Sequence, residues 1–201
     1  MADGLFSSLY KQIPTNIRLV GEQLFGKTSD ITEKDFTPQE LAFIKKQIEE
    51  KDLQNATKEA TLKAGLVQMT PEYENLRPMF EKELKTYQNT KGKTAINYND
   101  YNQKPDDYGW IDSIKQSFKS PEFKVATSLG QYVGIREPDG TIRVVDEYNW
   151  DNERKLLNKL KPEDYPEFIK TMLSDPASTV ATVMATLYPT QKRKVNITLP
   201  K

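Results

Sequence analysis

The chain has 201 residues, its 29 Lys and Arg balance 29 Asp and Glu, and it contains neither Cys nor His. These absences exclude a disulfide framework, a Cys- or His-ligated zinc site, a thiol nucleophile and a Ser-His-Asp triad, so any metal would need an all-oxygen site of the Mg or Ca kind. The zero net charge argues against electrostatic binding of the whole domain to nucleic acid, and the 36% hydrophobic content predicts one modest core.

The first 26 residues contain two short apolar patterns at helical spacing, separated by Pro14. The second pattern predicts a helix over about residues 15–25. We expect this N-terminal segment to dock on a core or on a partner subunit. The alternative is a membrane-interfacial helix, but such helices carry many basic residues and this segment has only Lys11 and Arg18.

Residues 27–90 are predicted to form a helical region that follows a polar connector. The run Thr37-Pro38-Gln39-Glu40 predicts a helix start, because Thr is a preferred N-cap, Pro suits the first turn and Glu completes a capping box. The pattern continues to about residue 66 as a long polar helix with a thin apolar stripe, which suits a partner helix or a peripheral packing position. A second start at Thr70-Pro71 opens another apolar stripe, which Pro78 is expected to kink or divide.

Residues 91–188 are predicted to form an α+β domain. Its first part is rich in turn formers and tyrosines, which either cover a small core or form a recognition surface, and residues 95–98 could be a short strand. A short helix is predicted over 110–118. Beyond it, Pro138-Asp139-Gly140 separates two β-prone runs and predicts an antiparallel hairpin over about 130–146, with Gly140 at positive φ.

Residues 189–201 are predicted to form an extended tail. The alternation of Val195, Ile197 and Leu199 could add a strand to a sheet edge, in this chain or in a neighbour. The basic cluster Lys192-Arg193-Lys194 is expected to be solvated. An uncharged helix predicted over about 175–188 is expected to be buried in the core or in a protein interface. The whole pattern predicts an α+β fold that is mostly helical, with one antiparallel hairpin and a C-terminal edge strand.

The stretch 129–152 combines Leu-Gly-x-Tyr, a Gly-containing turn, and then Asp146-x-Tyr148 followed by Trp150-Asp151. It resembles a block carried by many bacteriophage virion-associated proteins. The same block is similar to the catalytic core of colicin M-type bacteriocins. Those bacteriocins are phosphodiesterases that cleave the undecaprenyl-pyrophosphate lipid carrier of peptidoglycan precursors, so the resemblance implies a similar scaffold. It covers these residues only.

This resemblance implies a site at the end of the hairpin. Its candidate catalytic residues are Asp146, Tyr148, Asp151 and Arg154, and Asp146 with Asp151 could hold a divalent cation, Mg or Ca, through oxygen ligands alone. The enzyme pattern has a second Asp where this chain has Asn149, and the His that supplies its acid-base chemistry is missing here. The alternative role for Asp146 is structural, as a cap or as an acceptor of backbone N–H bonds at the strand end.

The sequence therefore predicts a bacteriophage virion-associated structural, assembly or ejection protein, located in the virion after assembly in the host cytoplasm. Its expected partners are other virion proteins in a homo- or hetero-oligomer, with contact to the host envelope on delivery and without a cofactor. The alternative is a colicin M-like phosphodiesterase that acts on a lipid-linked peptidoglycan precursor, with a divalent cation at its site. Direct DNA binding is the weakest hypothesis, because the charges balance.

Overall fold

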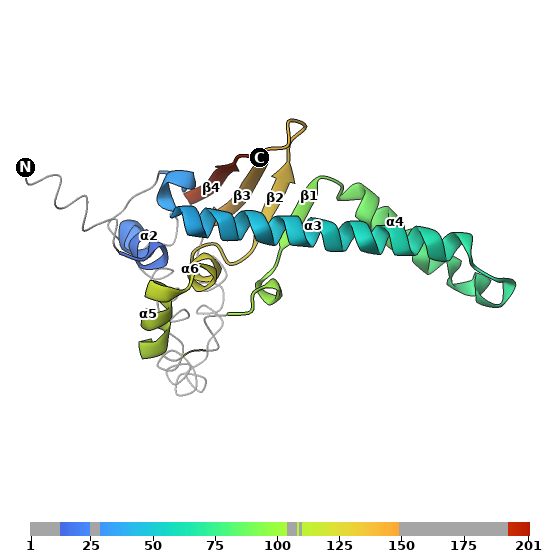
Figure 1. The fold of residues 1–201 in the computed structure, drawn as a ribbon, viewed down its shortest axis with the longest axis horizontal. Coiled ribbons are helices and arrows are strands. Elements are labelled where there is room, and N and C mark those ends of the chain that lie inside the picture. Colours follow the sequence, from blue (N-terminus) through green and yellow to red (C-terminus); the bar gives the residue numbers. More distant parts are fainter. Residues whose placement is uncertain (1–12, 25–28, 104–107, 109, 149–192) are drawn as a thin grey trace, which may run out of the picture.

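A computed structural model of the protein describes residues 13–24, 29–103, 108, 110–148 and 193–201. The described helices pack with a four-stranded antiparallel sheet, which confirms the α+β fold (Figure 1). The first helix, the predicted helix over 175–188, Asp151 and Arg154 lie outside the described residues. The α-helices of the described part are α2 (Thr15–Leu24), α3 (Pro38–Val67), α4 (Arg77–Asn89), α5 (Trp110–Lys119) and α6 (Pro121–Ser128). Short 3-10 turns add η1 (Glu33–Asp35), η2 (Pro71–Leu76) and η3 (Tyr98–Asp100).

The predicted hairpin is present, but it is the middle of a larger sheet. The expectation of a single hairpin is therefore wrong, because a further strand pairs with each of its two strands. The strands run in the order β1 (Lys93–Ile96), β2 (Tyr132–Arg136), β3 (Ile142–Tyr148) and β4 (Arg193–Leu199), each antiparallel to its neighbour. Gly140 closes the β2–β3 turn at φ +88°, as predicted. The two added strands alternate buried and exposed residues in register with the hairpin, which gives the sheet one buried face.

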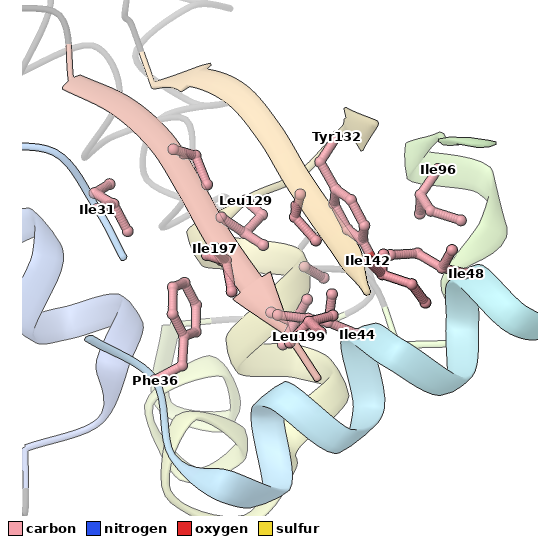
Figure 2. Packing of buried hydrophobic residues seen from close by; sticks show 14 of the residues in the cluster. Ile31, Phe36, Ile44, Ile48, Ile96, Leu129, Tyr132, Ile142, Ile197 and Leu199 are labelled. Atoms are coloured by element: carbon pink, nitrogen blue, oxygen red, sulfur yellow. The ribbon is translucent and has the colours of Figure 1, made fainter. Parts of the chain in front are cut away.

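The buried face of the sheet packs against the first half of α3. Ile44 and Ile48 of α3 are 0% and 1% exposed, and they lie against the inner residues of the strands (Figure 2). A Cβ atom on Gly134 of β2 would lie 2.7 Å from Ile48 Cδ1, so the helix approaches this strand closely only because residue 134 has no side chain. Thr37 caps α3 in the predicted capping box, accepting from Glu40 N.

The second half of α3 extends beyond the sheet and packs against α4 (Figure 1). Pro78 lies in the first turn of α4, so the predicted division into two helical pieces is confirmed. The Phe80 ring packs at Gly65, where an added Cβ would meet Phe80 Cε1 at 3.0 Å. We call residues 53–89 the arm and the other described residues the body.

The C-terminal strand is fixed to the N-terminal part of the chain by a buried chain of ion pairs. Arg193, expected to be solvated, is 0% exposed, because the period-two alternation of β4 places it on the inner face beside Val195. Its Nη2 donates to Glu22 Oε2 at 3.2 Å, Glu22 pairs with Arg18 at 3.0 Å, and Arg18 pairs with Asp35 at 3.3 Å. Of the predicted basic cluster 192–194, the structure describes Arg193 and Lys194, and Lys194 is exposed as predicted.

The outer edge of β4 is partly covered by the chain around Ile31. Ile31 N donates to Lys194 O at 2.8 Å, and Asn196 N donates to Ile31 O at 2.9 Å. These bonds satisfy backbone groups that would otherwise invite pairing with another chain. The helix α2 packs on the body through the fully buried Leu19. Within the described residues, no helix has the length and apolar character needed to cross a membrane.

Candidate functional site

Asp146 lies within strand β3 and not at its end. β3 runs two residues past Asp146 to Tyr148, because β4 pairs with it along that whole length, and Asp146 stands opposite Val195. The alternation of the strand puts Asp146 on the same face as the buried Ile142 and Val144, where its side chain is half-buried. Of the four candidate site residues, Asp146 is the one whose side chain the structure describes, so the predicted grouping with Asp151 and Arg154 stays a prediction.

The surroundings of Asp146 contain a buried tyrosine cluster that the sequence did not single out, formed by Tyr101, Tyr132 and Gln47. Tyr132 donates its phenol hydrogen to Gln47 Oε1 at 2.7 Å, and Gln47 Nε2 donates to the backbone oxygen of Asp100 at 3.3 Å. Tyr101 is 3% exposed, stacks on Phe43 with ring centroids 6.5 Å apart, and its buried Oη has no hydrogen-bond partner within the described part of the chain. The cluster therefore links β2, α3 and the loop at η3.

Electrostatics fix the charge state of this cluster. Burial raises the pKa of the Tyr101 and Tyr132 phenols well above the usual range, and the nearby charge of Asp146 raises that of Tyr101 further. Partial burial opposes ionisation of Asp100, but Lys51 Nζ at 2.6 Å and the backbone N–H of Asn97 outweigh it and lower the pKa of that carboxyl. Near neutral pH both phenols are therefore protonated and Asp100 is ionised, so these three groups supply no acid-base pair.

Within the residues that the structure describes, no group of three or more His, Cys, Asp or Glu side chains could hold a metal ion. The neighbour of Asp146 that the electrostatics identify is the Tyr101 phenol, and the neighbouring Tyr132 phenol forms a neutral hydrogen bond with the Gln47 amide. The described part of this candidate site fits a structural role, which is to hold the hairpin against α3.

The second candidate site is the tip of the arm, the end furthest from the sheet (Figure 1). Large apolar side chains are exposed there, with Val67 at 86%, Tyr73 at 58% and Met79 at 55%. Leu76 of η2, which lies between Tyr73 and Met79 in the sequence, is exposed as well. Isolated apolar side chains on a surface need no explanation, but several at one end of a projecting element are typical of an interaction surface.

The burial pattern of the arm sets this tip apart from the rest of the molecule. The buried residues of α3 are Glu40, Ile44, Gln47 and Ile48, all in the half that covers the sheet, and neither η2 nor α4 contains a buried residue. The sequence predicts one thin apolar stripe along this helix. In the structure Leu62 and Leu66 are half-buried on the α4 side, while Leu53 and Ala60 are exposed. The arm is thus held by modest packing and presents apolar side chains to solvent.

No protein-family model, curated protein or solved structure matches this chain. The grounds for a function are therefore the sequence block at 129–152 and the geometry of the body and the arm.

Proposed function

We propose that the protein is a bacteriophage virion-associated structural or assembly protein that binds neighbouring virion subunits through its arm. In this proposal the body is the folded anchor and the arm is the contact element. Its partners are other virion proteins, its place is the virion after assembly in the host cytoplasm, and it needs no cofactor. Contact with the host envelope on delivery belongs to the same proposal.

The observation that carries the proposal is the exposed apolar tip on an arm that adds little to the core. Exposed apolar side chains such as Val67 and Met79 cost solubility, and a domain that needed them for folding would bury them. A subunit contact would bury them instead. The resemblance of residues 129–152 to a block of phage virion-associated proteins supports the same class. The described part of that block, up to Tyr148, contains the central hairpin of the body.

Incorporation into particles tests this proposal. Density-purified virions of the source phage should contain the protein in stoichiometric amounts by quantitative mass spectrometry. Met79→Glu should reduce its incorporation strongly, because it places a charge in the apolar contact. Gln88→Glu is the matched control, since it adds the same charge at another exposed position of α4 and should incorporate like wild type. Purified virions without the protein, or equal incorporation of the two variants, would contradict the proposal.

The colicin M-like phosphodiesterase remains the alternative, and it rests on the resemblance of the 129–152 block. Incubation of the purified protein with lipid II and Mg²⁺ or Ca²⁺ separates the two, since the enzyme must release a pyrophosphorylated disaccharide-peptide. We expect no turnover by wild type or by Asp146→Asn. Cation-dependent cleavage by wild type that Asp146→Asn abolishes would favour the enzyme over the assembly protein.

A further inference from the structure

The C-terminal strand β4 lies between β3 and a segment from the N-terminal part of the chain, residues 29–33. Near the start of the strand, Arg193 Nε donates to Ser29 O at 2.8 Å. In the middle, Ile31 forms a parallel bridge with β4 and lies beside it (Figure 2). Near the end, Thr198 N donates to Glu33 Oε2 at 3.5 Å. The N-terminal segment therefore contacts β4 along most of its length.

The buried cation of β4 depends on α2 for its counter-charge. The Arg193 side chain is 0% exposed, and Glu22 of α2 is the carboxylate that pairs with it, at 3.2 Å. The Nη1 atom of Arg193 is buried without a hydrogen-bond partner among the described residues. A buried charge that loses its partner is strongly unfavourable. The inner face of the sheet can therefore hold Arg193 only while α2 is docked.

The ion pairs at this place form one neutral set. Arg193, Glu22, Arg18 and Asp35 alternate in sign along the chain of contacts, and their side chains are at most 14% exposed. Their formal charges sum to zero only when α2 and β4 are both in place. If either element undocks, an unbalanced charge stays in a region that is largely shielded from water.

Other contacts of α2 fix its position on the helices below it. Leu19 is fully buried, Thr15 Oγ1 donates to the buried Glu40 Oε2 at 2.8 Å, and Asn16 Nδ2 donates to Ser117 Oγ of α5 at 2.8 Å. None of these three contacts involves β4. They hold α2 where Glu22 can reach Arg193, so the docking of the helix decides whether the buried cation is neutralised.

We propose that α2 and β4 form a latch, that is, two elements far apart in the sequence that dock and release together. With all four charges in place, the latch stays closed and unfolds with the rest of the body. When the contact between Glu22 and Arg193 is lost, both elements detach while β1 and β2 stay paired. Release uncovers the edge of β3, which pairs with β4 from Ile142 to Tyr148 in the closed form. The inference concerns the body and does not rest on the proposed function of the arm.

Hydrogen exchange of the full-length protein tests the latch. Glu22→Gln keeps the shape of the side chain but leaves the buried Arg193 without a counter-charge. Amide exchange should become at least tenfold faster in both α2 and β4, while β1 and β2 exchange as in wild type. Glu50→Gln is the matched control, because it removes the same charge from an exposed pair with Lys46, and it should change neither element.

A rescue variant separates the charge from the loss of a contact. Adding Arg193→Met to Glu22→Gln removes the uncompensated cation and should return the exchange of both elements toward the wild-type rate. Four results would overturn the inference: no acceleration in Glu22→Gln, acceleration in one of the two elements alone, equal acceleration in all four strands, or no rescue by Arg193→Met.

Coupling between two elements is reciprocal, which provides a second test that leaves the charges intact. Leu19→Ala loosens α2 by removing fully buried apolar atoms and changes no ion pair or hydrogen bond to β4. Exchange should accelerate in β4 by a factor similar to that in α2. If α2 accelerates while β4 keeps its wild-type rate, the two elements open independently and the latch is refuted.

Discussion

The body and the arm share one helix, α3, yet they use it differently. In each half a glycine lets a large side chain pack closely: Gly134 receives Ile48 in the body, and Gly65 receives Phe80 in the arm. The body contact lies inside a core of side chains that are nearly all fully buried, whereas the arm contact lies on a helix pair without a buried residue in α4. Close packing is therefore present in both halves, but only the body removes a large apolar area from water.

This difference teaches that stability and binding are assigned to different parts of the chain. Apolar burial is the main favourable term in folding, so the body should unfold as the cooperative unit. The arm has few buried contacts and many solvent-exposed backbone hydrogen bonds, which place it at the low-stability end of the molecule. An element of that kind can be altered at its surface without loss of the fold.

The largest expected effect comes from removing a core side chain at the body end of α3. Ile44→Ala should lower the free energy of unfolding by about 2–5 kcal/mol, because it deletes fully buried methyl groups and leaves a cavity. Leu53→Ala, on the same helix but 69% exposed, is the control and should change it by about 0.5 kcal/mol or less. Chemical denaturation measures both, and equal effects would remove the distinction between the two halves.

The next effect tests the turn of the central hairpin. Gly140→Val should cost about 1–3 kcal/mol, because a β-branched residue is strained at φ +88°. Gly140→Asn should cost less, since Asn tolerates the left-handed region better than other residues. A melting temperature of Gly140→Val that equals that of wild type would show that the turn does not limit the stability of the body.

A smaller and local effect is expected in the arm. Gly65→Leu places a side chain where the Phe80 ring lies, and overpacking of this kind costs about 1–3 kcal/mol. The cost should fall on the contact between α3 and α4, so residues 68–90 should become sensitive to limited proteolysis while the denaturation midpoint of the body stays near that of wild type. If the protease also digests the body of Gly65→Leu, at a concentration that leaves the body of wild type intact, the arm belongs to the same cooperative unit as the body.

The buried tyrosines give the smallest effect at neutral pH. Tyr132→Phe should cost about 1 kcal/mol, because it leaves Gln47 without its donor, whereas Tyr101→Phe removes an unpartnered buried hydroxyl and should be neutral or stabilising. Both phenols have a folded pKa above the unfolded value. Their contribution to stability is therefore complete below the unfolded pKa of about 10 and is lost as the pH rises above it.

Absorbance titration at alkaline pH, with denaturation followed in parallel, checks this sign. The Tyr101→Phe variant should show the same reversible tyrosinate signal as wild type below the alkaline unfolding transition. A reduced signal would show that Tyr101 ionises in the folded state, and it would contradict the burial of this phenol in the body.

Local rules predict much of the body from the sequence. The capping box at Thr37, the positive φ of Gly140 and the alternation of Val195, Ile197 and Leu199 all follow from patterns within a few residues, and the structure confirms them. Long-range partners do not follow from such patterns. Nothing near Arg193 in the sequence indicates that Glu22 would pair with it, so a buried cation was read as a solvated one.

The candidate site was predictable to a lesser degree for the same reason. The sequence placed Asp146 at the end of the hairpin because the β-prone run weakens there, but pairing with β4 extends the strand to Tyr148. The tyrosine cluster brings Gln47 against Tyr132 from far along the chain, which one sequence cannot indicate. The sequence predicts the arm as part of a long polar helix with a thin apolar stripe, but the exposed apolar tip depends on how α3, η2 and α4 are arranged, which local patterns do not indicate.

Hydrogen exchange tests most directly whether the body holds the fold while the arm adds little to it. Amides of β2 and β3 should be protected with the free energy of global unfolding, and those of residues 58–89 should exchange much faster. Equal protection of arm and body would contradict the account.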